Sequence, residues 1–169
     1  DKTGRCAILF PHGVLFRKEE EVLRRKLVES DLIECIIGLG ANLFYNSPME
    51  ACIIICRKNK AQEAKGRITF INAVNEVVRK NAESYLEEKH IAKICKAYST
   101  QDNIDNFSRT VSNELVLENS ANLNISLYVS AVTATKISVL SVDDSIKQWQ
   151  IRNKQMYNEF DNLLSLIHG

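Results

Sequence analysis

The sequence predicts an α/β fold, in which a mixed sheet is followed by one long C-terminal helix. Three apolar runs, Cys6–Phe10, Leu32–Leu39 and Ala51–Cys56, are separated by a charged helical stretch and a polar loop. Continuous apolar runs of this length are typical of strands that are covered on both faces. The last segment, 142–168, instead has apolar residues at alternating steps of four and three, which indicates a helix.

The composition is that of a globular protein. The chain of 169 residues is 45% hydrophobic and 25% charged, and its net charge of +1 gives no argument for nucleic-acid binding from bulk charge. No apolar run approaches the roughly 20 residues of a membrane helix, and the N-terminus does not resemble a signal peptide. We therefore expect a cytoplasmic protein without a membrane partner, whose five cysteines are reduced thiols of the core.

The first strand and helix follow from residue types at their ends. The strand Cys6–Phe10 ends at Pro11, because proline cannot donate a hydrogen bond to a neighbouring strand. The stretch from Lys18 to about Ser30 has acidic residues before basic ones, which suits a helix dipole, and we expect it to be the crossover helix of a strand–helix–strand unit. The expected apolar stripe of this helix contains Val22, Leu23 and Leu27, with Val28 at its edge.

The next two strands, Leu32–Leu39 and Ala51–Cys56, are joined by a loop of about ten residues, which is too short for a helical crossover. We therefore expect these strands to pair antiparallel. Arg67–Ala73 is predicted to be a further short strand, and Val74–Lys80 is compatible with a helical turn.

The second half of the chain gives weaker patterns. Ser84 and Glu87 have capping-box spacing and predict a helix start. Residues 99–121 are polar and are expected to be irregular, whereas alternation over Leu123–Val129 predicts a half-buried strand. Ala131–Leu140 is compatible with a strand or an extended connection. The expected apolar face of the helix consists of Ile91, Ile94, Cys95 and Tyr98.

The C-terminal segment has a heptad pattern over about three and a half repeats. Asn153 is the polar residue in this pattern, and a buried Asn typically fixes register at a cost in stability. We expect an assembly helix in 141–169 that follows an α/β domain in 1–140. A terminal helix packed on its own domain would show the same pattern. The seam residues are Ile146, Trp149, Asn153, Met156, Phe160 and Leu163, flanked by Val142 and Ile167.

An ordered set of short sequence patches is similar to the modification (M) subunit of type I restriction-modification systems, the N6-adenine DNA methyltransferases. The resemblance covers about three quarters of the chain in the family's order. The patches that carry it are Gly4–Arg17, Arg24–Leu27, Ile33–Leu39, Asn42–Ser47, Ile53–Lys60, Phe70–Ala73, His90–Ile94, Phe107–Arg109 and Asn122–Val129.

The resemblance implies that this chain is the C-terminal part of such a subunit. These enzymes bind S-adenosylmethionine on a Gly-rich strand–helix turn and hold the target amine with an Asn-Pro-Pro-Tyr/Phe motif. The sequence has neither motif, since its two prolines, Pro11 and Pro48, are isolated. The first three strands would then be the fifth, sixth and seventh strands of a Rossmann-like methyltransferase sheet. An exposed edge would remain where the fourth belongs, and we expect dimerisation, edge pairing or covering by the terminal helix.

The same resemblance sets the expected activity and partners. The complete protein would methylate adenine N6 in DNA with S-adenosylmethionine as its cofactor, beside specificity (S) and restriction (R) subunits. This chain alone would be inactive, with no catalytic, cofactor-binding or metal-ligating residue. The alternative is a protein-interaction module without catalytic activity, which would form homo-oligomers through its C-terminal helix.

Candidate DNA-facing residues lie where the first two strands end. Phe44 and Tyr45 follow the second strand, and the resemblance implies a loop near the target base; stacking on that base and packing under the loop are both open. Pro11 and His12 end the first strand on the side where open α/β sheets bind ligands, although a plain turn has the same sequence.

Basic residues just beyond the first strand are candidates for phosphate contacts. A solvated helix face is the alternative, because acidic residues stand among them. The candidates are Arg17, Lys18 and Arg24.

Overall fold

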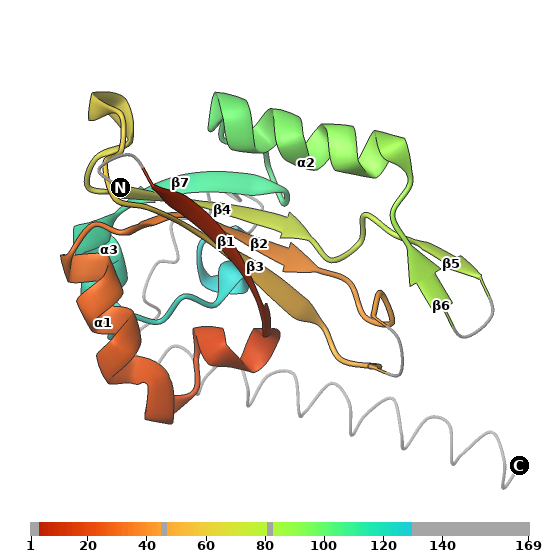
Figure 1. Ribbon diagram of the computed structural model, residues 1–169, viewed down its shortest axis with the longest axis horizontal. Coiled ribbons are helices and arrows are strands. Elements are labelled where there is room, and N and C mark those ends of the chain that lie inside the picture. The colour runs from red at the N-terminus through yellow and green to blue at the C-terminus, as the bar shows by residue number, and fades with distance from the viewer. Residues whose placement is uncertain (1–3, 45–46, 81–82, 130–169) are drawn as a thin grey trace, which may run out of the picture. The chain divides into compact units, whose positions relative to one another are not determined.

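The computed structural model describes residues 4–44, 47–80 and 83–129, and Figure 1 shows their arrangement. A five-stranded sheet has the order β1-β3-β2-β4-β7, and β5 and β6 form a separate two-stranded sheet. The strands of the main sheet are β1 (Arg5–Pro11), β2 (Ile33–Leu39), β3 (Ala51–Arg57), β4 (Arg67–Ala73) and β7 (Ser108–Ser112). The strands of the small sheet are β5 (Val78–Lys80) and β6 (Glu83–Tyr85).

The pairing of the first three strands confirms the antiparallel prediction. Strand β3 pairs antiparallel with β2 on one side and with β1 on the other. Strands β1 and β2 therefore run in the same direction, with β3 between them. Strand β4 is parallel to β2, so the carboxyl ends of β1, β2 and β4 point toward the same edge of the sheet.

Helices cover both faces of the sheet (Figure 1). Helix α1 (Glu21–Glu29), helix α3 (Asn113–Glu118) and the 3-10 turn η4 (Ile125–Leu127) lie on one face, and helix α2 (Glu88–Thr100) lies on the other. One core cluster contains Phe70 and Ile36, and the second contains Ile71, Ile37 and Ile94. All residues of β2 are buried, because both of its faces are covered. The predicted two-sided burial is thus confirmed for this strand.

Strand β1 does not follow that prediction. It lies at the edge of the sheet, and only Phe10 of its residues is half-buried, while the others are exposed. Ile8 and Leu9 are 41% and 48% exposed. The apolar run Cys6–Phe10 looks like that of a central strand, but no strand of the described chain pairs with its outer side. The exposed sheet edge that we expected is therefore present.

The buried face of α1 differs from the predicted stripe. Val22 and Leu23 are exposed, whereas Arg24 and Val28 are buried. The helix starts directly after a 3-10 turn, η2 (Lys18–Glu20). Its buried positions, 24 and 28, are each one residue beyond positions 23 and 27 of the expected stripe, which corresponds to a rotation of about 100° around the helix.

Helix α2 begins later than predicted. Glu87 is the N-cap and forms a capping box with His90, while Ser84 lies in β6. The buried residues of α2 are His90, Ile94 and Ala97, whereas Ile91 and Cys95 of the expected face are exposed. The prediction is confirmed for Ile94, which is buried, and for Tyr98, which packs against the core, but it is wrong for the other two residues because His90, a polar residue, takes a core-facing position.

Two stretches near the end of the described chain were predicted wrongly. The supposedly irregular stretch 99–121 contains β7 and α3, and Val78–Lys80 is a strand rather than part of a helical turn. The stretch Leu123–Val129 is not a strand but contains η4. Asn122 and Asn124 accept hydrogen bonds from backbone N–H groups two residues ahead, and such local bonds favour turns over strands.

The segment 130–169 lies outside the described residues. The predicted strand or connection Ala131–Leu140 and the whole predicted assembly helix are therefore untested predictions. Within the described part of the chain, no helix has the length and apolar character that crossing a membrane requires.

Candidate functional site

Two segments meet where the carboxyl ends of β1 and β2 lie. Ala51, the first residue of β3, is opposite both Pro11 of β1 and Leu39 of β2. Residues 12–18, which follow β1, and the loop 40–50, which joins β2 to β3, therefore leave the sheet at one edge (Figure 1). We call these two segments the carboxyl-end edge.

His12 and Glu50 connect the two segments. The backbone N–H of His12 donates to the carbonyl of Glu50 over 3.1 Å, and Nδ1 of His12 lies 3.0 Å from Oε2 of Glu50. An ionised carboxylate only accepts hydrogen bonds, so Nδ1 carries the proton in this contact. The ring of Phe16 lies edge-on to the imidazole, with centroids 6.1 Å apart. These contacts fix the orientation of His12.

The other imidazole nitrogen, Nε2 of His12, is buried and has no hydrogen-bond partner among the described residues. A histidine oriented by a carboxylate can take part in proton transfer, but Nε2 of His12 is hydrogen-bonded to no nucleophilic side chain of the described chain. Glu50 was not predicted, because its position opposite His12 depends on the register between β1 and β3.

The basic residues of this edge have different environments. Arg17 and Lys18 are exposed. A Cβ atom at Gly13 would lie only 2.7 Å from Nε of Arg17, which shows that this guanidinium folds back over the turn after β1. Any side chain larger than hydrogen at position 13 would therefore displace Arg17.

Arg24 is not available for the predicted phosphate contact in this geometry. The residue is 5% exposed, and its guanidinium donates to the carbonyl oxygens of Ala121, Val14 and Arg17 at 2.9, 3.0 and 2.7 Å. Burial lowers the pKa of this guanidinium. Arg24 thus connects α1 to the turn after β1 and to the segment before η4, which is a structural role.

The loop 40–50 presents an aromatic side chain to solvent. The side chain of Phe44 is 38% exposed. The backbone carbonyl of Phe44 accepts a hydrogen bond from the Ser47 N–H over 3.0 Å. Asn42 has a positive φ of 60°, and its carbonyl accepts the Ser84 N–H of β6. The loop is therefore held to the small sheet while Phe44 stays accessible. Tyr45 lies outside the described residues.

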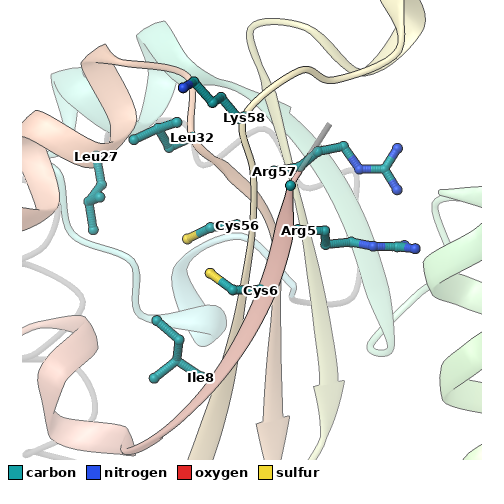
Figure 2. A pocket seen from close by; sticks show the side chains of 9 residues that line it. Arg5, Cys6, Ile8, Leu27, Leu32, Cys56, Arg57 and Lys58 are labelled. Atoms are coloured by element: carbon teal, nitrogen blue, oxygen red, sulfur yellow. The ribbon is translucent and has the colours of Figure 1, made fainter. Parts of the chain in front are cut away.

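The described residues do not fit an S-adenosylmethionine site. A Cβ atom at Gly13, Gly38 or Gly40 would meet atoms of the chain itself within 3 Å, so these glycines border no open cradle. Gly66 has a positive φ of 65° in the turn before β4. A hollow of about 640 Å³ lies at the other end of β1 and is lined by apolar, thiol and basic residues without a carboxylate for ribose hydroxyls (Figure 2).

Comparisons with known proteins agree on one family. The model of the N-6 DNA Methylase family matches residues 1–136. The type I restriction enzyme MjaVIII methylase subunit of Methanocaldococcus jannaschii is 41% identical over 133 residues, which are 76% of this chain and 23% of that protein. The MjaVII methylase subunit of the same organism is 37% identical over 161 residues, which are 92% of this chain and 28% of that protein.

Solved structures show the same likeness. The methyltransferase subunit of a type I restriction-modification system from Streptococcus thermophilus superposes with a TM-score of 0.70 at 38% identity, over 75% of this chain and 27% of that chain. The EcoKI M protein has a TM-score of 0.59 at 15% identity, over 88% of this chain and 39% of that one, which is a likeness of fold. The chain spans about a quarter of the length of the curated relatives quoted above.

Proposed function

Because the chain belongs to the N-6 DNA methylase family, we propose that it is the acceptor-side part of the methyltransferase domain in a type I restriction-modification M subunit. The observation that carries this proposal is the family match over 1–136, which includes every described strand and helix. The complete protein would transfer a methyl group from S-adenosylmethionine to N6 of adenine in DNA.

The carboxyl-end edge is the proposed acceptor-side surface. Base-modifying enzymes take the target base out of the duplex and stack it against aromatic or apolar side chains. Phe44 is an exposed aromatic on the loop after β2, and Pro11 and His12 border the same edge of the sheet. Arg17 and Lys18 are exposed cations near it and would contact phosphates.

The cofactor belongs to residues outside this chain in our proposal. S-adenosylmethionine supplies the methyl group when it is bound to the complete protein. We propose that the 169 residues alone are inactive and do not bind it, because the sequence has no Gly-rich cofactor turn and Gly13, Gly38 and Gly40 form no cradle. Titration calorimetry tests this part: tight binding of S-adenosylmethionine by the chain alone would contradict it.

The proposed partners are DNA and the specificity and restriction subunits of the complete complex. In this proposal the specificity subunit would read the DNA sequence, as the family resemblance implies. This assignment comes from the family and not from a contact of this chain.

A chimera tests the acceptor-side role directly. Residues 1–136 would replace the aligned part of the M. jannaschii MjaVIII methylase subunit, which would be assayed with its own specificity subunit, DNA and S-adenosylmethionine. We expect N6-methyladenine to form, as measured by mass spectrometry of nucleosides.

Phe44→Ala in the chimera should lower the rate of methylation about tenfold, since stacking is worth about 1–3 kcal/mol per base.

Met49→Ala is the matched control, because Met49 is 59% exposed on the same loop and is not aromatic. Its rate should stay close to that of the unaltered chimera. Equal losses in the two variants would contradict the stacking role of Phe44. A chimera that is folded and binds S-adenosylmethionine, yet leaves adenine unmethylated, would contradict the proposed function.

A further inference from the structure

Two cysteines are directly opposite each other where β1 pairs with β3. Cys6 of β1 is the register partner of Cys56 of β3. The Cys6 thiol is near enough to Cys56 to help raise the pKa of the Cys56 thiol. Figure 2 shows both sulfur atoms on the same side of the two strands, pointing toward one another. The two thiols thus form a pair on a single face of the sheet.

The backbone holds this pair at a distance that suits a disulfide. Lys58 donates its N–H to the Gly4 carbonyl over 3.1 Å, so positions 4 and 58 are a hydrogen-bonded pair. Such pairs recur every second residue in an antiparallel ladder, which makes Cys6 and Cys56 one of them. Their Cα atoms are then about 5.5 Å apart, within the roughly 4.4–6.8 Å found for disulfides.

The pair is accessible from outside the sheet. Cys6 is exposed and Cys56 is half-buried, whereas Cys35 and Cys52 are buried. Both Cys6 and Cys56 line the hollow of about 640 Å³, together with Leu27, Leu32 and Ile8. Lys58, which directly follows β3, lines the same hollow. A small anionic disulfide has both space and a cation there.

We propose that Cys6 and Cys56 are a dithiol site at which a low-molecular-weight disulfide, such as glutathione disulfide, forms a cross-strand disulfide. The Cys6 thiolate attacks one sulfur of glutathione disulfide, which yields a mixed disulfide at Cys6 and releases one glutathione thiolate. The Cys56 thiolate then attacks the Cys6 sulfur and releases the second glutathione. The dithiol is oxidised, and one glutathione disulfide is reduced to two glutathione molecules.

The order of the two steps follows from exposure. Burial and the neighbouring Cys6 raise the pKa of the Cys56 thiol to about 11, so few Cys56 thiolates exist at neutral pH. Cys56 is therefore a poor first nucleophile. It becomes an effective second one, because the sulfur that it attacks is already held beside it.

The product would connect the edge strand covalently to its neighbour. Among the described strands, β1 pairs only with β3. Its other edge pairs with no described strand. A bond between Cys6 and Cys56 would keep β1 in register when its backbone hydrogen bonds open. The site is thus a reversible modification site on the exposed edge, and it does not depend on the proposed function.

The test uses the full 169-residue chain with Cys95→Ser, which removes the exposed thiol of α2. The native protein is incubated with glutathione disulfide, and its intact mass is measured before and after dithiothreitol. We expect a loss of two hydrogens without a glutathione adduct, reversed by dithiothreitol. Fragmentation of the tryptic digest should identify the bond between positions 6 and 56.

Two further variants separate the steps, both made in the Cys95→Ser chain. With Cys56→Ser, the mixed disulfide at Cys6 should persist as one glutathione adduct. With Cys6→Ser, the reaction should slow at least tenfold, because the remaining thiols are half-buried or buried. Far-ultraviolet circular dichroism checks that each variant is folded.

Two results would overturn the proposal. One is a lasting glutathione adduct on a folded chain that retains both Cys6 and Cys56. The other is a folded chain that does not react, or one in which the bond joins a different pair of cysteines.

Discussion

A buried lysine shows how much of this fold depends on single contacts. Lys60 is 6% exposed, and its Nζ donates to Oδ1 of Asp31 over 2.5 Å and to the Arg67 carbonyl over 2.8 Å. Asp31 has a φ of +51° and also accepts the Gly66 N–H and the Asn113 side-chain amide. These residues join the turn after α1 to the starts of β4 and α3.

Replacing Lys60 tests this contact. Lys60→Met removes the cation and leaves the Asp31 carboxylate without its charged partner, which should lower the free energy of unfolding by about 3 kcal/mol. Urea denaturation measures the change. Lys65→Met, at an exposed position of the same connection, is the control and should stay within about 0.5 kcal/mol. Equal effects of the two substitutions would contradict the role of Lys60.

The same carboxylate predicts a pH dependence. Burial alone would raise the pKa of Asp31, but hydrogen bonds from Lys60, Gly66 and Asn113 lower it below its ordinary value. A lowered pKa in the folded state stabilises the protein above the pKa of the unfolded state. This stability is lost as the pH falls through the folded-state pKa.

In the Asp31→Asn variant, the free energy of unfolding should therefore change less as the pH is lowered. Lowering the pH from about 5 to about 3 should destabilise the unaltered chain more than the variant, because the variant has no carboxylate to protonate at this site. Thermal unfolding at each pH measures the two stabilities. The difference between the two chains should be largest near neutral pH, where Asp31 is ionised. Parallel curves would show that Asp31 does not contribute to the acid sensitivity.

Strands were predictable from sequence where apolar residues follow one another in a continuous run. The apolar runs of β2, β3 and β4 gave the right strands, and loop length gave the right direction for β3. The apolar pattern alone could not show that β1 is exposed, because its run resembles that of the buried β2; the open edge was expected only from the family resemblance. The sequence also missed Lys60 and Glu50, because both roles depend on contacts between residues far apart in the sequence.

The difference between the edge strand and its neighbour can be measured with one pair of residues. Ile8 of β1 and Ile54 of β3 are register partners, but Ile8 is 41% exposed and Ile54 only 6%. Ile54→Ala should cost about 3 kcal/mol, because it leaves a cavity in the core. Ile8→Ala should cost less than about 1 kcal/mol in the same denaturation experiment. Similar costs would mean that β1 is covered in solution.

At the scale of the whole molecule, the chain is a family member that spans about a quarter of the quoted relatives. The family and the exposed sheet edge were predictable, because ordered patches of sequence carry the likeness. The residues assigned to the acceptor side remain predictions. The boundary between an α/β domain in 1–140 and an assembly helix in 141–169 is also still a prediction. The packing of the segment around η4 was not predictable, since its alternating pattern also suits a strand.

The proposed assembly helix can be tested by removing it. Deletion of residues 141–169 should reduce the particle to a monomer, because the heptad residues that would pair two chains are lost. Light scattering measures the mass of both forms, and circular dichroism checks the fold of the shortened chain. An unchanged mass would contradict the role of this segment in oligomerisation.

The segment before position 130 determines where the chain can be shortened. Tyr128 stacks on Phe70 with ring centroids 4.4 Å apart, and the Leu123 N–H donates to the Leu15 carbonyl. A fragment that stops before Ala121 would lack Tyr128 and would expose the ring of Phe70, which is 0% exposed here. Anyone who expresses a minimal version of this protein should therefore end it no earlier than Val129, or expect it to precipitate.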